Sequence, residues 1–127
     1  GISKKQISQR VDKIIEYAEL EKFADTKFKN FSSGMQMRLA FATATQVDPD
    51  ILLLDEVYAV GDLKFQKKCF KTILDFKKQG KSIIIVSHGM DPIKTICDKA
   101  IFLNQGKIDT IGKPDEAIAA YIDYLGA

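Results

Sequence analysis

The sequence has few of the features that mark a secreted or membrane protein. It contains two cysteines, and no apolar run reaches the roughly 20 residues that cross a bilayer. The opening residues, Gly1 to Lys5, are not followed by the apolar core of a secretory signal. Because Cys69 and Cys97 stand among apolar residues, we expect buried thiols rather than a disulfide or a metal site. These absences predict a cytoplasmic setting, with any membrane association made through a partner.

An excess of charge of one sign is also lacking. The chain carries 19 basic and 17 acidic residues in interspersed order, for a net charge of +2. No single-sign field would steer it toward DNA or RNA, so we expect no nucleic-acid partner. The six lysines between Lys64 and Lys78 predict the solvated face of a helix, and phosphate binding there is the weaker alternative.

The hydrophobic pattern predicts one α/β domain with two parallel core strands. The apolar runs Ile51–Leu54 and Ser82–Val86 are unbroken, which is typical of parallel strands buried on both faces. The segment between them has helical spacing and ends at Gly80, which predicts a strand, helix, strand unit. Further expected elements are helices over Lys5–Phe23, from Ser33 to about Val47, over Leu63–Gln79, from Pro92 to about Asp98 and after Lys113, and a hairpin pairing Ala100–Leu103 with Lys107–Ile111.

Polar residues follow both predicted strands at their carboxyl ends. Asp55 and Glu56 follow the first, and Ser87 and His88 follow the second. Open parallel sheets bind ligands at that edge. In phosphoryl chemistry the first carboxylate can hold magnesium and the second can orient an attacking water. A neutral imidazole can contact a terminal phosphate as donor or acceptor.

Each of these residues also has an explanation that involves no ligand. Adjacent carboxylates can simply begin a solvated loop, and a lone histidine can be structural. Ser32, Ser33 and Gly34 can cap the helix that follows them, although a helix N-terminus is also where backbone N–H groups receive phosphate. What capping and loops leave unexplained is the order and spacing of all three groups together.

Taken together, these residues resemble the ABC ATPase family over essentially the whole chain. FSSGMQMRLAFA, Phe31 to Ala42, resembles the signature motif, usually LSGGQ, with its helix arginine at Arg38. ILLLDE, Ile51 to Glu56, resembles the Walker B strand, and VGD, Val60 to Asp62, occupies the place of the D-loop. VSH, Val86 to His88, resembles the switch-histidine strand. The SSGM form of the signature, DEVYAVGD, FQKKC and the GKPDEAIAAY tail are most similar to ATPases that export polysaccharides such as O-antigen or teichoic acid.

The resemblance implies ATP and Mg²⁺ as cofactors and a role for each matching residue. Asp55 would support magnesium, Glu56 would polarise the attacking water, and His88 would contact the terminal phosphate. Asp62 would communicate across a dimer of two ATPase subunits. The ATP held by the opposite subunit would be bound by Ser32, Ser33, Gly34, Met35 and Gln36. Met35 replaces the usual glutamine and Gly89 replaces a common acidic residue, and each departure removes a polar contact.

The sequence contains no GxxxxGK[ST] phosphate loop, so the cradle that supplies most phosphate binding is absent from these residues. The resemblance therefore implies the C-terminal portion of a partial P-loop NTPase fold: an α-helical signature subdomain over 1–47, and core strands with a terminal hairpin and helix over 48–127. We expect the chain alone to be inactive. Its implied partners are a missing N-terminal half with Walker A, a second ATPase subunit and a membrane permease that holds it at the inner face of the membrane.

Two other readings remain in view. An ABC-type ATPase that acts on DNA would carry long coiled-coil insertions, and no heptad run occurs here. A non-catalytic module would instead lend its signature face to the ATP of another subunit, which the missing phosphate loop favours. The resemblance also implies that the missing phosphate-loop strand lies next to the strand at Ile83–Val86. Without that strand, Ile83–Val86 would have an unpaired apolar edge, through which we expect the chain to self-associate.

Overall fold

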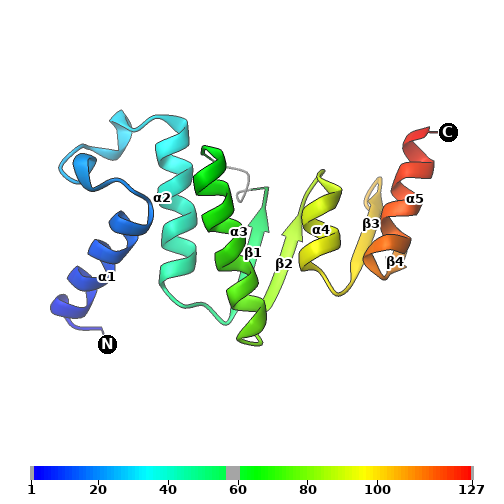
Figure 1. Ribbon diagram of the computed structural model, residues 1–127, viewed down its shortest axis with the longest axis horizontal. Helices are drawn as coiled ribbons and strands as arrows, with labels where there is room; N and C mark the ends of the chain where they lie inside the picture. The colour runs from blue at the N-terminus through cyan, green and yellow to red at the C-terminus, as the bar shows by residue number, and fades with distance from the viewer. Residues whose placement is uncertain (1, 57–60, 127) are drawn as a thin grey trace. The chain divides into compact units, whose positions relative to one another are not determined.

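The computed structural model describes residues 2–56 and 61–126, which form helices, two short sheets and two 3₁₀ turns (Figure 1). The backbone divides into two compact units, one ending at Ile84 and the other beginning at Ile85. Each unit is described by itself. The predicted functional division at residue 47 is a different one and stays a prediction.

The first unit opens with α1 (Lys4–Tyr17), which begins in a capping box. The Gln6 backbone N–H donates to Ser3 Oγ (3.2 Å), and the Ser3 N–H donates to Gln6 Oε1 (3.0 Å). The prediction of a helix as far as Phe23 is wrong, because the backbone turns left-handed at Glu19 (φ 57°). Glu21–Phe23 then forms the separate 3₁₀ turn η1.

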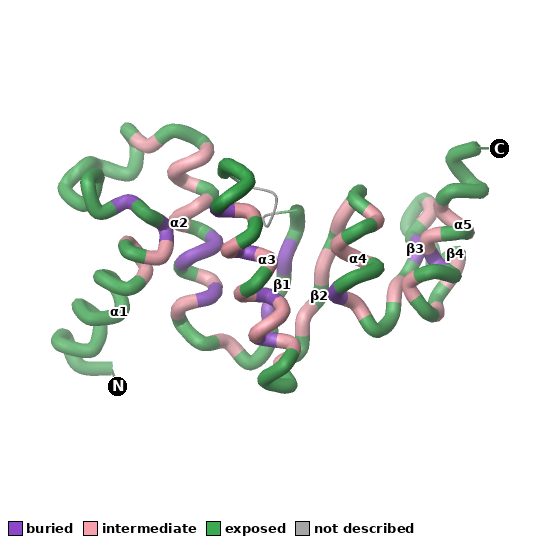
Figure 2. The backbone as a smooth tube through the Cα atoms, in the orientation of Figure 1, coloured by how far each residue is buried: buried purple, intermediate pink, exposed green. Residues whose placement is uncertain are grey.

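The second helix, α2 (Ser33–Gln46), follows the 3₁₀ turn η2 (Phe28–Asn30) and confirms the predicted helix over this segment. It packs against α1 around a small apolar core. No residue of α1 is fully buried, so this helix depends on its end and on the residues just after it for its packing (Figure 2). The core consists of Ala18, Leu20 and Ala42, surrounded by Ile14, Ile15, Tyr17, Phe31, Met35 and Leu39.

The predicted strand, helix, strand unit is confirmed by β1 (Ile51–Asp55), α3 (Leu63–Lys78) and β2 (Ser82–Val86). β1 and β2 pair in a two-stranded sheet and run in the same direction (Figure 1). α3 ends where the sequence predicts, at Gly80, which adopts the left-handed φ of 78° that glycine tolerates best. The buried side of α3 carries Phe65, Cys69, Ile73 and Phe76.

The prediction that both strands are buried on both faces is wrong for this chain. Burial alternates along β1, where Leu52 and Leu54 are each 3% exposed while Ile51 and Leu53 are 61% and 69% exposed. In β2, Ile84 and Val86 are also exposed. A parallel strand is buried twice only when elements cover both sides of the sheet. The described residues cover one side of β1.

The second unit contains α4 (Met90–Ile96), β3 (Ala100–Asn104), β4 (Lys107–Gly112) and α5 (Pro114–Gly126). The predicted hairpin is confirmed, with Ile101 opposite Ile111 and Leu103 opposite Ile108. Gln105 and Gly106 both have positive φ, 47° and 77°, as a two-residue turn that matches strand twist requires. α4 begins at Met90 and not at Pro92, which still lies in its first turn.

Aromatic packing joins α5 to one face of the hairpin. The Phe102 ring lies 5.4 Å from Tyr121 and 5.6 Å from Tyr124, between ring centroids. The opposite hairpin face carries Ile101, Leu103, Ile108 and Ile111, which are all exposed. Neither cysteine is in a disulfide; Cys69 is buried as predicted, and Cys97 is half-buried. No helix in the described residues has the length and apolarity to span a membrane.

Candidate functional site

The N-terminus of α2 presents the signature-like residues on the surface. Ser32 has extended backbone, and its Oγ accepts a hydrogen bond from the Met35 N–H (3.2 Å), which confirms the predicted N-cap. Ser32 and Ser33 are exposed, whereas Gly34, Met35 and Gln36 are half-buried. The helix therefore opens its first turn to solvent, where unpaired N–H groups and the helix dipole attract anions.

Two details refine this turn. The Gln36 side chain folds back, and its Nε2 donates to the Phe31 carbonyl (3.2 Å), so it braces the loop before the helix. A Cβ at Gly34 would meet only Ser32 Oγ, at 4.0 Å. No contact among residues 2–56 and 61–126 thus requires glycine at that position, and these residues leave room beside its backbone.

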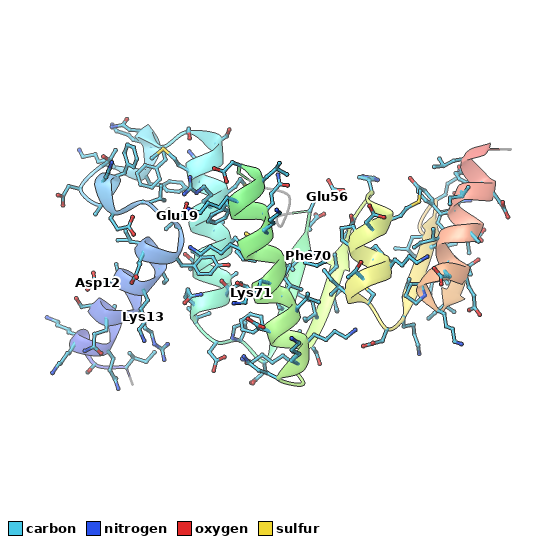
Figure 3. All side chains as sticks on the ribbon, viewed as in Figure 1. Asp12, Lys13, Glu19, Glu56, Phe70 and Lys71 are labelled. Atoms are coloured by element: carbon cyan, nitrogen blue, oxygen red, sulfur yellow. The ribbon has the colours of Figure 1, made fainter. Side chains whose placement is uncertain are left out.

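The predicted carboxylates lie at the end of β1. Asp55 is the last residue of the strand and is exposed, and Glu56 follows it just past the strand (Figure 3). Glu56 is exposed and has a left-handed φ of 57°, a conformation that residues other than glycine adopt rarely and often at functional sites. Both carboxylates thus stand at the carboxyl end of a strand, where a ligand can reach them.

The D-loop prediction falls partly outside the described residues, because Val60 is not among them. Asp62 is described and caps α3: its Oδ1 accepts from the Phe65 N–H (2.8 Å), and its carbonyl accepts from the Gln66 N–H (2.9 Å). Any role for Asp62 toward a second subunit must be compatible with this cap, which already uses one carboxylate oxygen.

Ser87 and His88 belong to the second unit. Ser87 Oγ accepts from the Gly89 N–H (2.9 Å) and donates to the Gly89 carbonyl (3.1 Å), which closes a tight turn before α4. His88, within this turn, is exposed. The expected meeting of His88 with the carboxylates of the first unit stays a prediction.

The described residues hold no group of three or more histidine, cysteine, aspartate or glutamate side chains able to bind a metal ion. Asp55 offers the oxygen ligands that Mg²⁺ prefers, but Mg²⁺ needs about six ligands in an octahedron. Any magnesium ion held by Asp55 would therefore have to take most of its ligands from other groups.

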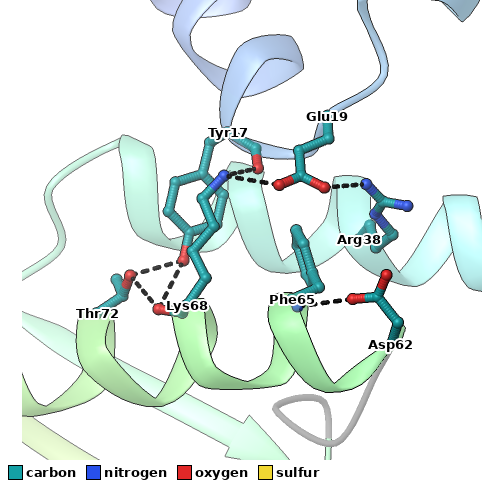
Figure 4. A network of polar contacts seen from close by, with 7 residues as sticks. All are labelled: Tyr17, Glu19, Arg38, Asp62, Phe65, Lys68 and Thr72. Carbon is teal, nitrogen blue, oxygen red and sulfur yellow. Dashed lines mark hydrogen bonds and ion pairs between the residues drawn. The ribbon is translucent and has the colours of Figure 1, made fainter.

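A polar cluster between α1, α2 and α3 was missed from the sequence (Figure 4). The carboxylate of Glu19 lies 2.9 Å from Arg38 Nη2 and 3.8 Å from Lys68 Nζ. Lys68 Nζ also donates to the Tyr17 carbonyl (2.6 Å). From the sequence, Arg38 was noted within the signature helix and Lys68 was counted among the solvated lysines, but no spacing rule connects either of them with Glu19.

Burial changes the acid–base chemistry of two groups beside this cluster. Burial raises the pKa of Tyr17 to about 12, although its hydroxyl lies 2.6 Å from Thr72 Oγ1, a contact that lowers the pKa. Burial likewise raises the pKa of Cys69 to about 11, against the nearby charge of Lys68. Both groups are neutral at physiological pH, so Cys69 is a packing residue with little thiolate character.

Comparison with known proteins connects this geometry to a family. The family model described as ABC transporter matches residues 2–59. The O-antigen export system ATP-binding protein RfbB of Klebsiella pneumoniae is 44% identical over 121 residues, 95% of this chain and 49% of that protein. The chain is thus similar to part of an ABC transporter ATP-binding domain. The teichoic acids export ATP-binding protein TagH of Lactococcus lactis is 41% identical over 98% of this chain and 27% of its own length.

Solved structures confirm the ABC cassette fold. The dimeric, ADP- and Pi-bound ATP-binding cassette MJ0796 superposes with a TM-score of 0.75 at 27% identity, over 90% of this chain and 50% of that one. The chain thus spans about half the length of a cassette and at most about half of the curated relatives named above. The predicted resemblance to polysaccharide export ATPases and the predicted α/β cassette fold are both confirmed.

Proposed function

We propose that this chain is the C-terminal portion of an ABC-type ATPase that couples ATP binding and hydrolysis to export of a polysaccharide, of the O-antigen or teichoic acid type, through a membrane permease. The observation that carries the proposal is the exposed, serine-capped start of α2, in a chain 44% identical to RfbB over 95% of its length. That turn offers backbone N–H groups and two serine hydroxyls to a phosphate.

The other site residues divide the chemistry among them. Asp55 supports a magnesium ion, which supplies charge neutralisation at the phosphates when it is bound. Glu56 accepts a hydrogen bond from the attacking water, and its left-handed backbone lies directly after the end of β1. His88 contacts the terminal phosphate, and Asp62 lies at the boundary with a second ATPase subunit. Ser32 to Gln36 bind the phosphate of ATP that this second subunit holds.

The chain by itself has no phosphate loop in its sequence, so we expect neither ATP turnover nor tight ATP binding from it. A competing function follows from the same observation: a non-catalytic module that offers only the α2 turn to ATP on another subunit. The two functions differ in whether Glu56 acts on a nucleotide held by its own polypeptide.

A chimera tests this difference. This chain would replace the matching half of Klebsiella RfbB, whose remaining half would supply the other part of the cassette. Magnesium-dependent ATP turnover by the chimera should fall on the order of 10²- to 10⁴-fold in Glu56→Gln, because the water loses its general base. Asp50→Asn, an exposed carboxylate just before β1, is the matched control and should keep turnover near that of the unmodified chimera.

Turnover that survives Glu56→Gln would reject catalysis by this glutamate and support the non-catalytic module. Restoration of O-antigen export in cells by the active chimera, and its loss in Glu56→Gln, is the expected result for the export function. An active chimera that restores no export would separate ATP hydrolysis from the proposed substrate.

A further inference from the structure

Glu19 has a backbone conformation that its side chain does not favour. It follows the C-cap residue Ala18 of α1 and has a φ of 57°. The Glu19 N–H donates to the Glu16 carbonyl and the Leu20 N–H to the Ile15 carbonyl, each at 3.0 Å. This is the Schellman arrangement, in which glycine is the usual residue at the left-handed position. A glutamate there costs backbone energy that another interaction must offset.

The side chain of Glu19 supplies that interaction by lying between two cations from different helices. Its Oε2 lies 2.9 Å from Arg38 Nη2 of α2, and its Oε1 lies 3.8 Å from Lys68 Nζ of α3 (Figure 4). Arg38 and Glu19 are partly sheltered, with side chains 23% and 40% exposed. Arg38 Nε is buried and has no hydrogen-bond partner in the described part of the chain, so the ion pair with Glu19 offsets part of the cost of burying this guanidinium.

Both cations also lie over the same buried ring. Arg38 Cζ is 4.8 Å and Lys68 Nζ is 5.7 Å from the centroid of Phe65, which is 1% exposed. The backbone N–H of Phe65 donates to Asp62 Oδ1. A continuous set of contacts therefore leads from α2, which starts at the signature turn, through Arg38 and Phe65 to the Asp62 cap of α3.

We propose that Glu19 is a positioning residue: by pairing with Arg38 and Lys68, it fixes the signature turn at Ser32–Gly34 relative to the Asp62 cap. Its consequence for ATP turnover rests on the proposed function, while the positioning itself does not. A turn that must meet a nucleotide on another subunit gains from a fixed geometry, because misplacement of a binding group by about 1 Å is costly.

The test uses the 127-residue chain and amide NMR with hydrogen exchange, with no nucleotide present. Glu19→Gln should shift the amide resonances of both Ser33–Met35 and Asp62–Phe65. It should also speed exchange of the Gln36 and Gln66 amides about tenfold, because their bonds to the Ser32 and Asp62 carbonyls open more often. Arg38→Gln should do the same, and the double variant should add little, since both changes remove one interaction.

Two further variants separate the side chain from the backbone. Glu19→Gly suits the left-handed conformation, so it should keep the fold and still loosen both segments, as Glu19→Gln does. Glu21→Gln removes a nearby exposed carboxylate and should leave both segments unchanged. Changes confined to residues near Glu19, or full additivity of Glu19→Gln and Arg38→Gln, would overturn the proposal. Because ATP is absent, failure here is distinguishable from failure of the chimera to hydrolyse ATP.

Discussion

The first unit is joined by contacts between residues far apart in sequence, whereas the second is built from neighbours along the chain. Tyr17 meets Thr72 and Lys68, and Glu19 meets Arg38, across three helices. In the second unit β3 turns directly into β4, and α5 follows at once to pack on Phe102. Long-range contacts require closure of long loops before they stabilise anything. The predicted signature turn and the carboxylates Asp55 and Glu56 therefore lie in the unit whose folding depends more on contacts between distant parts of the sequence.

The largest effect that should separate the units comes from their central phenylalanines. Phe65→Ala removes a ring that packs on Tyr17 and lies under two cations, and should cost about 3–5 kcal/mol. Hydrogen exchange read by mass spectrometry should then show lost protection in the first unit, with β3, β4 and α5 still protected. Phe102→Ala is the matched variant, and should remove hydrogen-exchange protection from the second unit before the first. Equal loss in both units in both variants would show that they unfold as one.

Alkaline pH should destabilise the first unit selectively. The folded pKa values of Tyr17 (about 12) and Cys69 (about 11) are raised above 10.0 and 9.0, so the unfolded state loses these protons first. Their contribution is complete below about pH 9 and is lost as pH rises toward about 12. Urea unfolding at rising pH should show this loss, and Tyr17→Phe should reduce it. Tyr121→Phe in the second unit is the control; an equal reduction there would contradict the assignment.

The smallest effect on stability should come from the exposed strand faces, which both units possess. Leu53→Lys in β1 and Leu103→Lys in β3 replace side chains that are 69% and 64% exposed, so each should change stability by about 0.5 kcal/mol or less. Self-association, measured by light scattering at rising concentration, should nevertheless decrease. An unmodified chain that stays monomeric would contradict the expected association. An effect of only one variant would identify the face that contributes, and association that neither variant reduces would leave the edge of β2 at Ile83–Val86 as its cause.

The elements were predictable where the sequence contains a local signal. Ser32 marks the start of α2, Gly80 marks the end of α3, and Gln105-Gly106 marks the hairpin turn, because capping and turn geometry depend on a few adjacent residues. The end of α1 was missed because Glu19 adopts a left-handed backbone conformation, which glutamate rarely does. The double burial expected of β1 was wrong because burial depends on what covers the sheet, which the strand itself does not encode.

In the candidate site, too, residues marked by a local sequence signal were predictable, and residues brought together only by packing were not. The candidate residues of the motif-bearing loops were proposed from their order and spacing and from the family resemblance. The comparison confirmed that resemblance, while the roles of the residues stay predictions. The cluster around Glu19 was not found, because its members lie on three helices at separations that follow from packing. Lys68 in particular was grouped with five other lysines as a solvated face, yet it contacts Glu19, Tyr17 and Phe65.

The uncovered faces of β1 and of the hairpin have a consequence for the life of this polypeptide in a cell. Short extended segments rich in isoleucine and leucine are what chaperones bind and what proteases reach when a chain lingers without its neighbours. The abundance of such a chain would thus depend less on the packing of its own helices than on how soon another polypeptide segment covers Leu53 and Leu103. Chaperones and proteases would therefore act on these two exposed faces before the chain bound any ATP.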